Sequence, residues 1–175
     1  MVDVGVNIAS DTDPMPYFTA PEALPLEKLD AVVLTHSHLD HAGMLPVLFK
    51  YGYRGPVYCT PPTRDLMLLL QTDYIKVGGA EGKRPAYDME DIRTCMKHVV
   101  DVEWGETTDI TPDIKLTMSN AGHRLGSSAL HMHVADGKHN IVFSGDQKYE
   151  KSWLFDAATV SYTHLRAHET SNDRV

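Results

Sequence analysis

The chain has 175 residues, which suits one domain of ordinary size, and 42% of them are hydrophobic, enough for a real core. No run is long enough to span a bilayer, and the N-terminus lacks the basic start and apolar stretch of a secretion signal. Cys59 and Cys95 stand far apart, so we expect no disulfide framework and a reducing, cytoplasmic setting. The formal net charge of −8 is unfavourable for contact with nucleic acid. Either such a surface lies outside this chain or the substrate is not nucleic acid.

The first half of the chain predicts short strands joined to helices. Val2–Val6 is strand-like, and residues 7–25 are rich in Pro, Asp and Thr, as loops are. Ala31–Thr35 is a short β-branched run typical of a buried strand. A helix should follow, with Pro46 in its first turn and an apolar face made by Met44, Leu45, Leu48 and Phe49.

Between this strand and helix lies the stretch THSHLDHAG, residues 35–43. In an extended segment His36 and His38 point to the same side, so both can reach one ion. Asp40 and His41 come where the chain turns into the helix, so they can face a neighbouring ion. Imidazole nitrogen and carboxylate oxygen suit zinc. The pattern therefore predicts half of a dinuclear metal site; the alternative is an exposed histidine-rich loop without metal.

The rest of the chain predicts two more helices and a run of strands. Gly55–Cys59 reads as a strand, followed by a long helix with Thr60 as its N-cap, Pro61 as its first residue, and Gly78 or Gly79 at its end. Its core-facing stripe should be Leu66, Leu69, Leu70 and Tyr74. A helix over residues 88–98 and four strand-like runs follow. This order favours an α/β fold, one half of an αββα sandwich.

Two later residues have the setting of metal ligands. His123 lies in a glycine-rich turn between two strands, which can direct its side chain inward. Asp146 follows a strand directly, where ligands often gather. By contrast, His131 and His133 alternate with apolar residues along one strand, so we expect them on the surface or in a second layer.

Three segments carry a resemblance to a known family. THSHLDHAG resembles the signature of the metallo-β-lactamase fold superfamily. NAGHRLGSS (residues 120–128) and FSGDQKYEK (residues 143–151) are similar to motifs of its nucleic-acid-processing β-CASP branch. YGYRGPVYCTPPTRDLMLLLQTDYI and TPDIKL resemble the archaeal homologues of the cleavage and polyadenylation specificity factor nuclease. The resemblance covers residues 2–159.

The resemblance implies a ligand set for two Zn²⁺ ions. His36, His38 and His123 would bind one ion, Asp40 and His41 the other, and Asp146 would bridge both. Asp3 resembles an aspartate behind the metals that orients the imidazoles; its alternative role is that of an ordinary strand-end residue. A further histidine for the second ion would lie beyond Asp146, where we find no candidate.

The implied activity is zinc-dependent hydrolysis of phosphodiester bonds in single-stranded RNA. The enzyme would be an endoribonuclease, a 5′–3′ exoribonuclease or both, acting in RNA 3′-end processing, transcription termination or decay, with Asp40 and Asp146 as catalytic carboxylates. The ions would activate water and neutralise charge in the transition state. The resemblance involves no membrane and allows a homodimer of the parent protein. Arg54, Arg124 and Lys148 could meet phosphate, but the sequence does not place them.

The ends of the chain indicate a fragment. The start resembles the family without its first strands, and VSYTHLRAHET (residues 160–170) matches the translation of a common sequencing adapter. We therefore expect a partial metallo-β-lactamase domain over residues 1–159 and a non-native tail over residues 160–175. A small-molecule hydrolase of thioesters or lactams, or an inactive metal-binding module, remain the alternatives.

Overall fold

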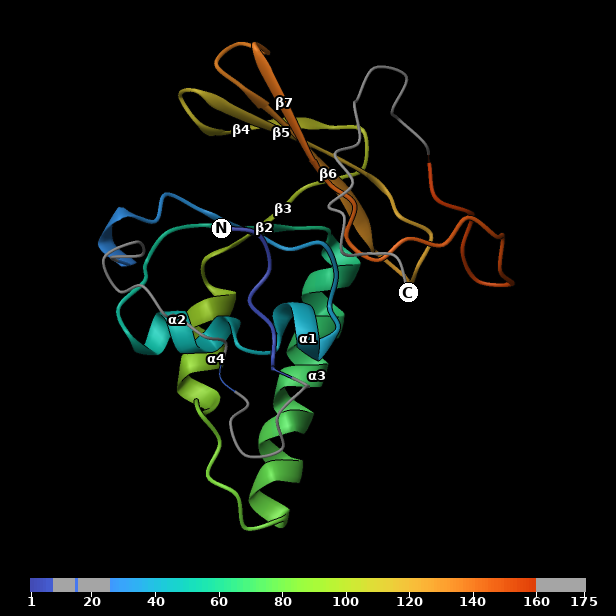
Figure 1. The fold of residues 1–175 in the computed structure, drawn as a ribbon. Helices are drawn as coiled ribbons and strands as arrows, with labels where there is room; N and C mark the ends of the chain where they lie inside the picture. Colours follow the sequence, from blue (N-terminus) through green and yellow to red (C-terminus); the bar gives the residue numbers. More distant parts are fainter. Residues whose placement is uncertain (8–14, 16–25, 160–175) are drawn as a thin grey trace, which may run out of the picture.

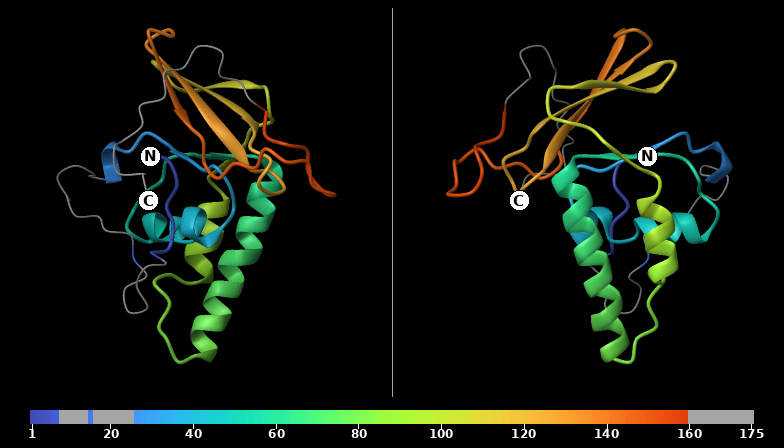
Figure 2. Two further views of the ribbon diagram at one scale, coloured as in Figure 1. Left: turned by 45° about the vertical axis from the view of Figure 1, so that its right-hand side comes forward. Right: turned by 180° about the vertical axis from the view of Figure 1, so that it is seen from behind.

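The computed structural model describes residues 1–7, 15 and 26–159. Within them a layer of helices, a parallel sheet and an antiparallel sheet lie one on another (Figure 1 and Figure 2). The elements in chain order are η1 (Leu26–Lys28), β1 (Val32–Val33), α1 (Leu39–Ala42), α2 (Leu45–Lys50), β2 (Val57–Cys59), α3 (Pro61–Ala80), α4 (Met89–Met96), β3 (Val99–Asp101), β4 (Thr107–Thr111), β5 (Ile114–Asn120), β6 (Ser128–Val134) and β7 (His139–Phe143). The predicted α/β class is confirmed. The predicted tail lies outside the described residues.

The two sheets are stacked, with one hydrophobic core on each side of the parallel sheet. That sheet has the order β1-β2-β3, and the antiparallel sheet has the order β4-β5-β6-β7. Since side chains alternate across a strand, Val32 packs with the helices, while its neighbour Val33 packs with Leu116 and Leu130 of the second sheet. Among the described residues, all four α-helices lie on the side of the parallel sheet away from the second sheet (Figure 1).

The long helix α3 begins and ends close to the predicted residues, but its buried face is different. Thr60 is its N-cap and accepts a hydrogen bond from the Thr63 amide, as predicted. The predicted stripe is wrong at Leu69, whose surface is 64% exposed. The fully buried positions, four residues apart, are Thr63, Met67 and Gln71. Two of these are polar and are buried because they bond distant backbone carbonyls, which an apolar pattern cannot reveal.

The other elements mostly follow the sequence. The apolar helix is α2, with Pro46 in its first turn, and the predicted face residues Met44, Leu45, Leu48 and Phe49 are all buried. Strand β4 was not predicted, because Thr107–Thr111 is largely polar and forms the exposed edge of its sheet. Within the described part of the chain, none of the helices has the length and apolar character that crossing a bilayer requires.

The N-terminal segment makes one strand-like bridge and then turns onto α1. Val2 bridges Val33 in parallel, but Asp3 has a positive φ of 55°, which carries the chain away from the sheet. The Val4 amide then donates to the His41 carbonyl at 2.6 Å, and the Val6 amide to the Leu39 carbonyl at 2.7 Å. The predicted strand is therefore a single bridge, and the segment places Asp3 beside the residues of α1.

Gly5 is required for this close approach. A Cβ atom at Gly5 would lie 1.6 Å from the Asp40 carbonyl oxygen. We expect Gly5→Ala to lower the free energy of unfolding by about 3 kcal/mol, the upper range for overpacking, because the obstructing atom is backbone. Gly79→Ala is the control, because no atom lies within 4 Å of the place that a Cβ atom would take at Gly79. Alanine also has a higher helix propensity than glycine. In urea titrations followed by circular dichroism, the unfolding midpoint should fall for Gly5→Ala and rise for Gly79→Ala. Equal midpoints for the two variants would contradict the packing described.

Candidate metal centre

Three segments of the chain bring the predicted ligand residues together. His36 and His38 lie between β1 and α1, with His38 at the N-cap of α1, and Asp40 and His41 lie in α1. His123 lies in the turn between β5 and β6, and Asp146 lies three residues after β7. His36 is fully buried, whereas 47% of the Asp146 side chain is exposed. The cluster therefore has a closed side in the core and an open side toward solvent.

One group of four donors faces a common point. His36, His38, His123 and Asp146 each offer an atom, and these atoms lie within 4.8 Å of one another. His38 Nδ1 lies 2.8 Å from His36 Nε2 and 3.2 Å from His123 Nε2. Asp146 Oδ2 lies 3.6 Å from His123 Nε2. Tetrahedral ligands at zinc–nitrogen distances stand roughly 3.4 Å apart, so the spacing fits a metal ion.

Thr35 holds the His36 ring in the form that binds metal. The Thr35 hydroxyl donates its one proton to Asp3 Oδ2 at 2.8 Å, because a carboxylate can only accept. The same hydroxyl must therefore accept from His36 Nδ1, 3.0 Å away. His36 Nε2 is then left with a lone pair directed at the other donors. Burial lowers the pKa of His36 to about 3, which keeps the imidazole neutral.

Asp3 orients the other side of the cluster directly. His41 Nδ1 donates to Asp3 Oδ2 at 2.9 Å, which raises the pKa of His41 and turns its Nε2 toward the remaining carboxylates. That Nε2 lies 3.8 Å from Asp40 Oδ2 and 3.6 Å from Asp146 Oδ1. The two oxygens of Asp146 thus face different groups: Oδ2 faces the first group and Oδ1 faces His41.

The turn that carries His123 is fixed by its contacts with α3 and with the segment after Asp146. The Gly126 carbonyl accepts from the Thr60 and Thr63 hydroxyls at 2.7 and 3.0 Å. The Ala121 carbonyl accepts from the Lys148 amide at 2.9 Å. Gly122 has a φ of 68°, and a Cβ there would lie 2.3 Å from the Lys148 carbonyl oxygen. This packing, which the sequence does not reveal, leaves His123 facing His38.

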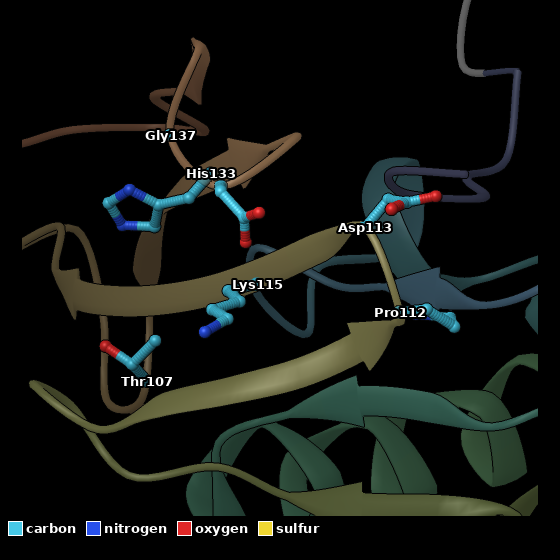
Figure 3. Close-up of a pocket in the computed structure, with 7 residues that line it drawn as sticks. Thr107, Pro112, Asp113, Lys115, His133 and Gly137 are labelled. Atoms are coloured by element: carbon cyan, nitrogen blue, oxygen red, sulfur yellow. The ribbon is translucent and has the colours of Figure 1, made fainter.

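The histidines of β6 lie away from this cluster. His133 lines a depression of about 340 Å³ on the antiparallel sheet, together with Lys115 and Asp113 (Figure 3). Leu130 and Met132, which alternate with the two histidines, pack in the core between the sheets, as predicted. Within the described residues, the only group of three or more potential ligands close enough to share an ion is the one around His36.

Thr35 is a positioning residue that the sequence reading missed. Its place directly before His36 gives no hint of its role, because its partner Asp3 is 32 residues away. We expect Thr35→Val to weaken metal binding by about 10- to 100-fold, since the hydrogen bond that fixes the His36 ring would be lost. Zinc titration against a chromophoric chelator measures this, with circular dichroism to show that the fold is kept. Unchanged affinity would contradict the role derived for Thr35.

Comparison with known proteins agrees with this geometry. A family model described as a beta-lactamase superfamily domain matches residues 11–161. The chain is similar to "Transcription termination factor FttA" of Methanosarcina mazei, 57% identical over 165 residues, which covers 94% of this chain and 26% of that protein. Over the same shares it is 53% identical to the factor of that name from Methanococcus maripaludis and 50% identical to that of Methanocaldococcus jannaschii. The chain thus spans about a quarter of these relatives, and it belongs to the beta-lactamase superfamily.

Proposed function

We propose that this domain carries the zinc centre of a ribonuclease that hydrolyses single-stranded RNA during transcription termination, 3′-end processing or decay. The observation that supports this most is the convergence of His36, His38, His123 and Asp146 in a domain closely similar to archaeal termination factors. Because it would act on newly made RNA, the protein would be cytoplasmic. The proposal also includes a homodimer of the parent protein.

The role of each residue follows from the other ligand atoms that its own nitrogen or oxygen atoms face. His36, His38 and His123 would hold one Zn²⁺, Asp40 and His41 the other, and Asp146 would lie between them with one oxygen toward each. When bound, zinc supplies Lewis-acid chemistry and lowers the pKa of water. Asp40, 39% exposed, would accept the proton of the attacking water. Asp3 and Thr35 keep the imidazole lone pairs directed inward.

The openness of the centre suits a polymeric substrate. An open depression of about 430 Å³ is lined by residues that include Asp3, Thr35, His41 and Asp146. It borders the side of the centre at His41, and its lining includes the buried Thr35 and the 47% exposed side chain of Asp146. A flexible chain can enter an open depression of this kind.

The direct test uses the protein in its full reading frame. Zinc-loaded protein is incubated with a 5′-labelled single-stranded RNA, and the ends of the products are identified. We expect cleavage that leaves a 5′-phosphate and a 3′-hydroxyl and that stops when zinc is removed by a chelator. Hydrolysis of a thioester or a lactam with no cleavage of RNA would overturn the proposal in favour of a small-molecule hydrolase.

A further inference from the structure

Ser127 is a fully buried polar residue at the end of the turn that carries His123, and the roles above do not use it. Its hydroxyl oxygen accepts hydrogen bonds from two successive backbone amides, those of His123 and Arg124, both at 3.1 Å. Its own backbone closes the same turn: the Ser127 amide donates to the Arg124 carbonyl at 3.0 Å, and the Ser127 carbonyl accepts from the Ala121 amide at 3.0 Å. One residue therefore holds the backbone on both sides of the His123 Cα atom.

The two bonds to the hydroxyl fix the direction in which the His123 side chain leaves the backbone. The peptide groups before and after the His123 Cα atom each direct one amide at Ser127 Oγ. Because each peptide group is planar, the orientation of these two planes sets the direction of the Cα–Cβ bond between them. The imidazole extends from there to within 3.2 Å of His38 Nδ1 and 3.6 Å of Asp146 Oδ2. The place of His123 Nε2 among the donors therefore depends on Ser127.

The other hydrogen bonds of the turn do not replace this support. The Gly122 amide donates to Asn120 Oδ1 at 2.8 Å, which fixes the start of the turn but not the peptide group after His123. Among the described residues, the amides of His123 and Arg124 have no acceptor other than Ser127 Oγ. A backbone amide that loses its acceptor must find another one. Removal of the hydroxyl should therefore let both peptide groups rotate.

We propose that Ser127 is a positioning residue of the metal centre, whose hydroxyl holds His123 in the direction that binds the ion shared with His36 and His38. The proposal rests on the proposed function, because it takes the cluster to hold zinc. Ser127 contacts neither the ion nor the substrate and acts through His123. Its bonds lie within the turn, so the imidazole is directed before the ion binds, and less freedom is lost on binding.

The test compares Ser127→Ala with Ser152→Ala in the protein in its full reading frame. Ser152 is a matched control, because its hydroxyl also accepts from two successive amides, those of Leu154 and Phe155 at 3.3 and 2.9 Å, in a turn without proposed ligands. In competition with a chromophoric chelator, we expect Ser127→Ala to weaken zinc binding about ten-fold or more and Ser152→Ala to stay within about two-fold. The visible absorption of Co²⁺ depends on its ligands, so the spectrum of Co²⁺-loaded protein should change in Ser127→Ala alone.

A measurement on the wild-type protein does not depend on the folding of a variant. Hydrogen–deuterium exchange of the metal-free protein, measured at single residues by mass spectrometry, gives the protection of the amides of the turn. We expect the amides of His123 and Arg124 to exchange at least about ten-fold more slowly than that of Leu125, which has no acceptor among the described residues. Equally fast exchange at all three would overturn the proposal, because the hydroxyl would not hold the turn before zinc binds.

The outcomes separate this proposal from the one it rests on. Weaker zinc binding and altered Co²⁺ absorption in Ser127→Ala alone support the positioning role. Wild-type zinc affinity in Ser127→Ala overturns it, even if the protein holds zinc and cleaves RNA. Equal losses in the two variants, or a loss with unchanged Co²⁺ absorption, also overturn it, since the effect would then come from the fold. A wild-type protein that takes up no zinc overturns the proposed function itself.

Discussion

Replacing His123 by alanine is expected to weaken zinc binding by about 100-fold or more. The structure places His123 Nε2 3.2 Å from His38 Nδ1 and 3.6 Å from Asp146 Oδ2, so it is one of four donors around a common point. Four-ligand zinc sites bind with roughly 10–16 kcal/mol, so that one donor contributes about 3 kcal/mol. Zinc titration with a competing chelator gives the affinity directly.

His131→Ala is the matched control for that change. His131 is an imidazole of the adjoining strand β6, but its Nε2 faces Asn140 at 3.0 Å on the sheet surface. We expect its removal to leave the zinc affinity within about two-fold of wild type, because it lies outside the donor group. Equal losses in the two variants would mean that the histidines act through the fold rather than as ligands.

The second large effect is expected for Asp146→Asn. The amide keeps the shape of the side chain but removes its negative charge and turns an NH₂ group toward one of the two donor groups. Because the oxygens of Asp146 face His123 and His41 separately, we expect the zinc content of the protein in its full reading frame to fall from two ions to one or fewer. RNA cleavage by the protein in its full reading frame should fall by on the order of 1,000-fold, since the carboxylate that would help to hold both ions is lost.

Asp156→Asn tests whether that loss is specific. Asp156 lies ten residues further along the same segment and pairs with Lys151 at 3.0 Å, with 78% of its side chain exposed. The change in charge is the same, but we expect full zinc content and full cleavage. Retention of two ions by Asp146→Asn, measured by atomic absorption, would contradict the bridging position.

The sequence predicted the candidate ligand residues better than it predicted the hydrogen bonds that hold these residues in place. His36, His38, Asp40 and His41 lie in one short segment, and local strand and helix geometry suffices to group them. His123 and Asp146 were predicted from motifs, because a sequence separation of 85 between His38 and His123 gives no information on their distance in space. The resemblance indicated Asp3 as an orienting residue, but the role of Thr35 and its contact with Asp3, 32 residues away, are seen only in the folded chain.

The fold predictions failed where polar contacts decide burial. The inward face of α3 is set by Thr63 and Gln71, which bond the carbonyls of Gly126 and Ala42, and not by the leucines around them. Val2–Val6 has the composition of a strand, but the backbone of α1 takes its hydrogen bonds after Asp3. In both cases a tertiary hydrogen bond overrides a local hydrophobic pattern.

The most direct test of the metal centre is anomalous diffraction, at the zinc absorption edge, from zinc-loaded crystals of the protein in its full reading frame. We expect one peak about 2.0–2.2 Å from His36 Nε2, His38 Nδ1, His123 Nε2 and Asp146 Oδ2. A second peak about 3.5–4 Å away should lie beside Asp40, His41 and Asp146 Oδ1. The absence of a peak between the imidazoles, or a peak only at surface histidines such as His133, would contradict the account.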